Sequence, residues 1–188
     1  MYTIWTGERV RLRPFADEHE WLEMQEEMHR EPNDFWGAWW HPRAKLKKEF
    51  EETGMLEAGK ECVFAIERLD TGEAVGFEEC GPCYGPSAIS GWVGTFIKRE
   101  QWSRGFGFEA KLLAMCFMFE NFPYVRVGAD TVANHKRAAR GLQLCGMTFE
   151  GRTHGVHYTD GKYHDIVCYR ILREEWEQLP IRQIVKRG

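Results

Sequence analysis

Residues 93–117 of this 188-residue chain are VGTFIKREQWSRGFGFEAKLLAMCF, and this stretch decides the fold. Its first residues are strand-like, and the nearly continuous apolar run over about 106–121 predicts a helix that packs against a sheet. The glycine-rich turn between them would place several unpaired backbone N–H groups at the positive end of the helix dipole. Gly105 and Gly107 would let the backbone approach a diphosphate, and Arg104 would add a charge-assisted contact. The same residues would also form an ordinary tight turn into a helix, so this motif alone does not decide between that turn and a diphosphate site.

The flanking sequence supplies a sheet around this unit. Upstream, a strand closed by a proline precedes two helices and then three strands, whose short turns indicate an antiparallel meander. Downstream, Gly146 stands where a further helix would end. The expected strands are 8–14, 61–68, 73–80, 89–98, 124–132, 147–153 and 164–171, and the expected helices follow Asp17 and cover 43–53, 106–121 and 136–145. This order predicts a mixed α/β (α+β) fold, in which a sheet of about seven strands carries helices on both faces within a single domain over 1–188.

The composition limits the classes of partner. With 25 Lys and Arg against 29 Asp and Glu, the net charge is -4, which does not give the basic field that nucleic-acid binding requires. The first residues lack the apolar run of a secretory signal, and no stretch approaches the roughly 20 apolar residues of a membrane span. We therefore expect a soluble, cytoplasmic protein that binds neither nucleic acid nor membranes. The six cysteines lie mostly in apolar runs, which favours reduced thiols over disulfides.

The glycine turn also fits a different cofactor. Gly105-x-Gly107-x-x-Ala110, followed twenty residues later by Asp130, matches the dinucleotide fingerprint of an NAD(P)-dependent oxidoreductase. That fingerprint sits directly behind the apolar first strand of βαβ units, whereas here a polar segment intervenes and the earlier strands form a meander. The oxidoreductase therefore stays a secondary alternative.

Two cysteines spell a further motif. Cys80-Gly-Pro-Cys83 has the spacing of a thioredoxin-type redox site, but the residues that follow cannot begin the helix which that chemistry needs. The same pair could bind zinc together with His154 and His157, provided that two separate loops meet. We expect a turn between strands and no metal.

Four segments of the chain, taken in order, point to one family. Residues 102–110 resemble a Trp-Gly-Lys-Gly-Tyr-Ala-like turn with a Thr-Glu-Ala helix start, and HKRAARGLQLCGMTFEG (135–151) resembles the second motif of the same family. DGKYHDIVCYRILREEW (160–176) is similar to its closing hairpin and Leu-Arg-x-Glu-Trp signature, and RVRLRP (9–14) to its start. The family is the GNAT acetyltransferases, in their RimJ/RimL-like branch. The resemblance implies a GNAT fold with a largely antiparallel sheet, and transfer of an acetyl group from acetyl-CoA to a primary amine by direct attack in a ternary complex.

The resemblance also implies where acetyl-CoA binds. One strand would pair with the pantetheine arm through its backbone, the turn would hold the pyrophosphate, and the acyl carbonyl would lie in the splay between the strands 89–98 and 124–132. In the second motif, either Asn134 or His135 would take the polar contact with the pantetheine. The implied acetyl-CoA-binding residues are Phe96, Ile97, Lys98, Trp102, Ser103, Arg104, Gly105, Phe106, Gly107, Phe108, Asn134, His135 and Arg140.

Two departures from the family pattern concern catalysis. Leu142 stands where many relatives carry a tyrosine that protonates the leaving thiolate, and Trp92 stands where many carry a glutamate. The remaining acidic candidates are Asp130 and one of Glu78 and Glu79, whose side chains point to opposite faces of a strand. We take Glu78 and Asp130 as the candidate catalytic residues. An acyl-CoA-binding module that has lost catalysis remains the alternative.

The acceptor is expected to be an amine: a small amine, a polyamine or a protein N-terminus. The candidate acceptor-binding residues are Trp36, Trp39, Trp92 and Tyr158. The first two belong to an aromatic cluster in the region that lines the acceptor pocket of relatives, next to a helix with an acidic face. Rings and carboxylates together would suit a cationic amine. Homodimers are common in this branch, so a homodimer is an open expectation.

Overall fold

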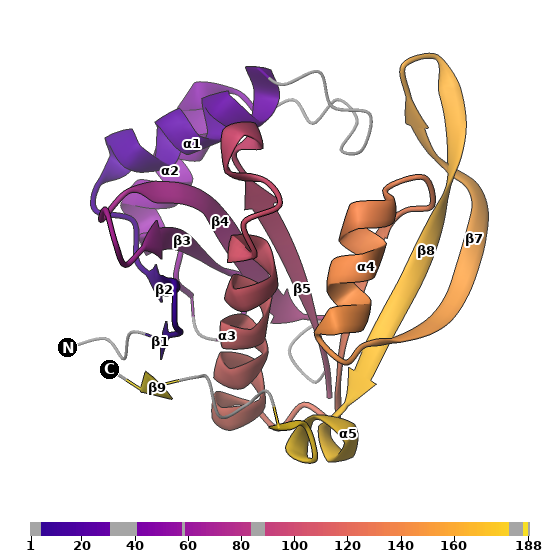
Figure 1. The fold of residues 1–188 in the computed structure, drawn as a ribbon. Coiled ribbons are helices and arrows are strands. Elements are labelled where there is room, and N and C mark those ends of the chain that lie inside the picture. Colours follow the sequence, from indigo (N-terminus) through magenta and orange to yellow (C-terminus); the bar gives the residue numbers. More distant parts are fainter. Residues whose placement is uncertain (1–4, 31–40, 58, 84–88, 181–185, 188) are drawn as a thin grey trace.

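The computed structural model of the chain describes residues 5–30, 41–57, 59–83, 89–180 and 186–187 (Figure 1). Its helices are α1 (Glu18–Arg30), α2 (Arg43–Thr53), α3 (Phe106–Asn121), α4 (Lys136–Leu144) and α5 (Arg173–Glu177), with a 3-10 turn η1 (Arg99–Gln101) before α3. Its strands are β1 (Trp5–Thr6), β2 (Val10–Arg13), β3 (Cys62–Arg68), β4 (Ala74–Pro82), β5 (Ser90–Ile97), β6 (Arg126–Val132), β7 (Thr148–Thr159), β8 (Lys162–Leu172) and β9 (Lys186–Arg187). Within the described ranges, no helix is long and apolar enough to cross a bilayer.

The described strands form one sheet in the order β7-β8-β6-β5-β4-β3-β2-β1-β9. Every neighbouring pair among them is antiparallel except β5 and β6, which run parallel. The parallel contact begins at Ser90 and ends where Trp92 faces Gly128. Beyond that level β5 stays paired with β4 and β6 stays paired with β8. The sheet therefore separates between β5 and β6, where the family resemblance implied a splay between the strands.

Two apolar cores cover the two faces of this sheet. On one face α3 lies across the strands with α4 beside it, and on the other face α1 and α2 pack together (Figure 1). Trp21, Leu46 and Phe77 belong to the core under α1 and α2. Helix α3 is apolar on most sides because it contacts the sheet, α4 and the C-terminal part of the chain. Helices on both faces were predicted, and this prediction is confirmed.

The predicted helices at 43–53 and 106–121 are present with those bounds. The seven predicted strands are present too, and β1 and β9, of two residues each, were not predicted. Such short edge strands leave almost no periodic pattern in the sequence because alternation needs four or more residues. The prediction of a mixed, largely antiparallel sheet is confirmed.

The last hairpin corrects one expectation. A polar hairpin was expected between strands at 147–153 and 164–171, and the strands are longer than that, since β7 and β8 continue through the hairpin and leave only the turn Asp160–Gly161. The φ angles of these two residues are 50° and 71°, which match a two-residue hairpin turn whose twist suits the flanking strands. The segment looks like a loop in the sequence because β7 is largely exposed on both faces, so no apolar alternation marks it.

The C-terminal end of α3 is fastened by Arg173. The guanidinium of Arg173 donates to three backbone carbonyls, those of Phe119, Phe122 and Tyr124, at 2.7–2.8 Å. Trp176, 1% exposed, lies behind it and stacks on the ring of Phe119. The Leu-Arg-x-Glu-Trp sequence therefore has a structural reason, since it closes the last turn of α3 against the sheet.

Replacing Arg173 by alanine should destabilise the fold by about 3 kcal/mol, because three carbonyls lose a charged donor at once. Chemical denaturation of the purified variant measures this change. Lys48→Ala is the matched control, since its exposed pair with Glu52 contributes roughly 0.5 kcal/mol or less. Equal stability of both variants would contradict the role of Arg173.

Candidate active site

The turn before α3 has the geometry of an anion site. Ser103 and Gly105 adopt positive φ angles of 62° and 85°, which turn the chain sharply into the helix. The first intrahelical bond runs from Glu109 N–H to Gly105 O at 3.1 Å, so the N–H groups of Phe106 and Gly107 point out of the helix end. A Cβ on Gly107 would lie 3.2 Å from Ile97 Cγ1, which shows how closely α3 approaches β5. The turn can accept a diphosphate along its backbone.

Arg9 completes this turn, and no sequence motif pointed to it. The buried carboxylate of Glu109 accepts the backbone N–H groups of Arg9 and Val10 at 2.8 and 3.1 Å. The Arg9 guanidinium then donates to Arg104 O at 2.8 Å and lies 2.8 Å from the position that a Cβ on Gly105 would take. The fold therefore places a second cation, Arg9, at the start of α3, although the two are about a hundred residues apart in the chain.

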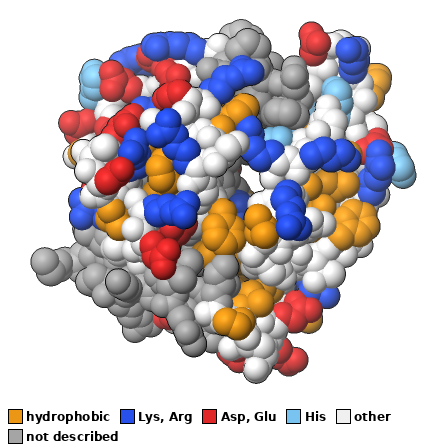
Figure 2. All heavy atoms as spheres, viewed as in Figure 1, with side chains coloured by type: hydrophobic (Ala, Val, Ile, Leu, Met, Phe, Trp, Pro, Cys, Tyr) orange, Lys and Arg blue, Asp and Glu red, His pale blue; other side chains and the backbone are white. Residues whose placement is uncertain are grey.

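Trp102 is held between cations beside the turn. The Arg137 guanidinium lies 3.4 Å from the centre of its ring and that of Arg99 5.4 Å from it. The indole Nε1–H of Trp102 donates to Ile97 O at 2.7 Å. Figure 2 shows that basic side chains gather on this face around a hollow between the upper ends of α3 and α4.

Some of the backbone groups proposed for acetyl-CoA are already bonded. Lys98 N–H donates to Val75 O at 2.9 Å, and Trp102 N–H donates to Arg99 O at 3.1 Å. Neither N–H is free for a ligand here, so the predicted contacts of Lys98 and Trp102 would use their other atoms. The side chain of Phe96 lies in the core under α1 and α2, on the face away from α3.

The structure separates Asn134 from His135. His135 is the residue before α4, and its ring nitrogens lie 3.4 Å from Thr131 Oγ1 and from Arg137 Nη2. Burial, together with the charge of Arg137, lowers the pKa of His135 to about 4, so the imidazole is neutral at pH 7. Through Arg137 it joins the group around Trp102.

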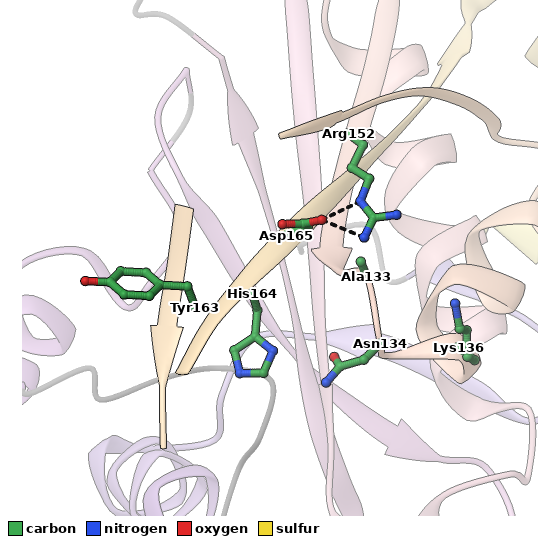
Figure 3. A pocket seen from close by; sticks show the side chains of 7 residues that line it. All are labelled: Ala133, Asn134, Lys136, Arg152, Tyr163, His164 and Asp165. Atoms are coloured by element: carbon green, nitrogen blue, oxygen red, sulfur yellow. Dashed lines mark hydrogen bonds and ion pairs between the residues drawn. The ribbon is translucent and has the colours of Figure 1, made fainter. Parts of the chain in front are cut away.

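Asn134 instead borders a separate hollow of about 380 Å³ beside the last hairpin (Figure 3). The hollow is lined by Ala133, Asn134, Lys136, Arg152, Tyr163, His164 and Asp165. Of the two candidates for the pantetheine contact, His135 is therefore the one beside the α3 turn. Arg140, a third predicted contact, is exposed on α4.

Glu78 and Glu79 on β4 face opposite sides of the sheet. Glu78 is 0% exposed and faces α3, where its carboxylate lies 3.7 Å from Lys111 Nζ. Glu79 is half-buried on the other face and lies opposite Gly94 of β5. A Cβ on Gly94 would be 2.6 Å from Glu79 Oε1, so the absent side chain makes room for this carboxylate. Burial raises the pKa of Glu79 to about 7, and the negative charge of Glu61 acts in the same direction.

Trp92 and Asp130 share the face of Glu79. On β5, Val93 packs in the core under α3, so Trp92 points to the opposite side. On β6, Val127 lies in that same core, and by the same alternation Asp130 faces away from it, where it is exposed. The face therefore carries carboxylates on both sides of the parting strands.

The remaining predicted acceptor residues are not placed in this group. Tyr158 is 59% exposed on β7, near the tip of the hairpin, and its ring lies 5.0 Å from that of Tyr163. It lies on the strand, two residues before the hairpin turn. Trp36 and Trp39 lie outside the described residues.

A family model for the acetyltransferase (GNAT) domain matches residues 9–148, which are most of the chain. The chain belongs to the GNAT acetyltransferases. A curated relative, the SPbeta prophage-derived uncharacterized N-acetyltransferase YokL of Bacillus subtilis (strain 168), is 26% identical over 180 residues, 93% of this chain and 96% of the relative. The protein is thus an N-acetyltransferase by family, as the motifs predicted.

Solved structures show the same fold. A chimera of the spermidine N-acetyltransferase SpeG from Vibrio cholerae and hSSAT superposes with a TM-score of 0.78 at 16% identity, over 92% of this chain and 100% of that one. RimL, a ribosomal alpha-N-protein acetyltransferase in complex with coenzyme A, gives 0.72 at 16% identity, over 91% and 99%. At these identities the likeness establishes the fold alone.

The dinucleotide and thiol-redox interpretations lose their support in this acetyltransferase. The family match replaces the dinucleotide interpretation of the glycine turn. All six cysteines are free thiols, and burial raises the pKa of Cys80, which is the opposite of what redox catalysis needs. Among the described residues, no group of three or more His, Cys, Asp or Glu side chains is placed to hold a metal ion.

Replacing Arg9 by alanine should weaken CoA binding on the order of 10-fold, since one charge-assisted contact to a phosphate is lost. Isothermal titration calorimetry with CoA measures this. Arg11→Ala is the control on the same strand, because Arg11 pairs with Glu67 and not with the turn. If Arg9→Ala and Arg11→Ala bind CoA equally well, Arg9 does not contact the nucleotide.

Proposed function

We propose that this acetyltransferase moves an acetyl group from acetyl-CoA to a cationic primary amine, with the two substrates entering from opposite faces of the sheet and meeting where β5 and β6 part. The observation that carries the proposal is the arrangement around this parting. An anion-binding turn with its cations lies on the α3 face, and Glu79 lies on the opposite face.

Acetyl-CoA, which is a substrate here, fits the α3 face by charge and by shape. The N–H groups at the start of α3, together with Arg9 and Arg104, form a cradle for a pyrophosphate. Glycine at 107 lets the start of α3 lie close to β5, since a Cβ there would be 3.2 Å from Ile97 Cγ1. His135, neutral at pH 7, is able to exchange a hydrogen bond with an amide of the pantetheine arm.

The acceptor side is acidic, which favours an amine. Glu79, Glu61 and Asp130 lie on or beside the face away from α3, where a substrate ammonium would be attracted. An amine must lose a proton before or during attack on the thioester. Burial raises the pKa of both Glu78 and Glu79 to about 7, and Glu79 is the one on the acceptor face, where it can remove this proton. The names of the structural neighbours, a spermidine and a protein alpha-N-acetyltransferase, agree with polyamines and protein N-termini as the acceptors to test first.

The test has two parts. Acetyl-CoA should raise the melting temperature of the protein and NADH should not, because a ligand that binds the folded state stabilises it. Acetyl-CoA should then release free thiol in the presence of spermidine, other small amines or peptides with free N-termini. Binding without turnover on any amine would support the non-catalytic module instead, and absence of acetyl-CoA binding would reject both.

Glu79→Gln should lower kcat/KM on the order of 100-fold, which is the usual contribution of a general base. In the unchanged enzyme, kcat/KM should rise with pH through a midpoint near 7, because Glu79 acts only when it is ionised above its pKa. The variant should lose this rise. Steady-state kinetics over about one and a half pH units on each side of the midpoint would measure this rise.

Glu61→Gln is the matched control for this profile. Removing the negative charge beside Glu79 should move the midpoint below 7 while turnover persists. A midpoint that stays in Glu79→Gln, or that ignores Glu61→Gln, would show that another group titrates.

A further inference from the structure

The core under α3 contains a charged pair that the fold does not explain. Glu78 is 0% exposed, and Lys111 of α3 is 9% exposed, with 3.7 Å between the carboxylate and Nζ. Lys111 is the sole buried lysine or arginine in the described part of the chain. Neither carboxylate oxygen of Glu78 has a hydrogen-bond partner among the described residues. Burying two charges costs more free energy than packing two apolar side chains, so such a pair points to a functional role.

The position of Lys111 connects it with the parting of the strands. Its ammonium donates to Thr95 Oγ1, and Thr95 lies on β5 three residues beyond Trp92, where β5 and β6 have separated. A Cβ on Gly107, at the diphosphate turn, would lie 3.5 Å from Thr95 Cγ2. Lys111 is one helical turn further along α3, about 6 Å towards the last β5–β6 pair. Lys111 therefore lies beside the path that acetyl-CoA would follow from the α3 turn to the point where β5 and β6 separate.

Burial raises the pKa of Glu78 to about 7 against the opposing charge of Lys111, and two further groups near this point cannot give a proton easily. Leu142 of α4, 3% exposed, is apolar. Burial raises the pKa of the Cys145 thiol to about 12, with the charge of Lys111 opposing and that of Glu78 adding to the shift. The titratable groups that face Lys111 are Glu78 from β4 and Cys145 after α4, with Cys80 beside Glu78.

We propose that Lys111, positioned by Glu78 and Thr95, donates the proton to the CoA thiolate as it leaves; this rests on the proposed function. The amine nitrogen forms its bond with the acetyl carbon, the C–S bond breaks, and its electron pair goes to sulfur. The Lys111 ammonium then transfers one proton to that sulfur. The acylated nitrogen loses a proton to Glu79 or water, and Lys111 regains one from solvent as CoA departs, so the proton count closes.

Glu78 has a positioning part in this scheme. Its carboxylate lies 3.7 Å from the Lys111 ammonium and holds that side chain beside Thr95. Thr95 fixes the direction of one N–H and leaves the others to point elsewhere. A hydrophobic pair at 78 and 111 would keep the fold and lose this function, which is the distinction that the experiment uses.

The first measurement follows the thiol of bound CoA and needs no acceptor. Thiolate absorbance is titrated with bound CoA, and the same titration with bound desulfo-CoA is subtracted to remove the protein cysteines. An ammonium in contact with the sulfur stabilises the thiolate, so a thiol pKa lower by at least about one unit in the unchanged enzyme than in Lys111→Met would show that Lys111 reaches the sulfur, and the second measurement then tests the proton transfer. Equal thiol pKa values would overturn the assignment of Lys111.

The second measurement separates proton donation from packing. Glu78→Leu with Lys111→Met removes both charges and leaves none unpaired, and its melting temperature should match that of the unchanged enzyme or exceed it. Its kcat should fall on the order of 100-fold with acetyl-CoA and much less with the selenium analogue of acetyl-CoA, whose more acidic leaving group needs no proton. An equal fall with both donors would overturn the proposal.

The outcomes also distinguish this inference from the proposed function. Failure of the unchanged enzyme to bind CoA would overturn both. Normal turnover in the unchanged enzyme and in the double variant would leave the acetyltransferase function standing and reject Lys111 alone.

Discussion

The short parallel contact between β5 and β6 is the constraint on which the rest of this structure depends. It ends at the level of Trp92 and Gly128, while each strand stays bonded to its antiparallel neighbour. The backbone edges beyond that level have no strand between them, so an extended ligand can occupy the position of a missing strand. Because α3 connects the two parallel strands, its N-terminus stands at the open end of the parting. The site for a phosphate and the site for an acyl group are thus parts of one topological unit.

The charged groups around α3 divide into two kinds. Glu109 accepts two backbone N–H groups at one end of the helix, and Arg173 donates to three carbonyls at the other. These charges are saturated with hydrogen bonds, and they fasten the helix to the N- and C-terminal parts of the chain. Glu78 and Lys111, in the middle, are paired at 3.7 Å without such saturation. Buried charges that the fold does not satisfy are the ones with reason to serve chemistry.

The sheet also separates two electrostatic environments. Cations gather beside α3, where Arg9 and Arg137 lie, and carboxylates such as Glu79 and Asp130 lie on the opposite face. A polyanionic donor and a cationic acceptor would each be drawn to one face and kept from the other. The two substrates then need no shared binding surface, and their reacting groups meet only through the parting of β5 and β6.

The sequence by itself determined the order of the longer elements, the helix bounds at 43–53 and 106–121 and the glycine turn, because local periodicity and glycine placement are properties of consecutive residues. It also gave the family, through motifs spread along the chain in order. Only the tertiary structure decided that Arg9 reaches the turn, that Glu79 faces away from α3 and that Glu78 pairs with Lys111. Each of these depends on strand register and on contacts between residues far apart in sequence, where a shift of one residue would turn every side chain to the other face.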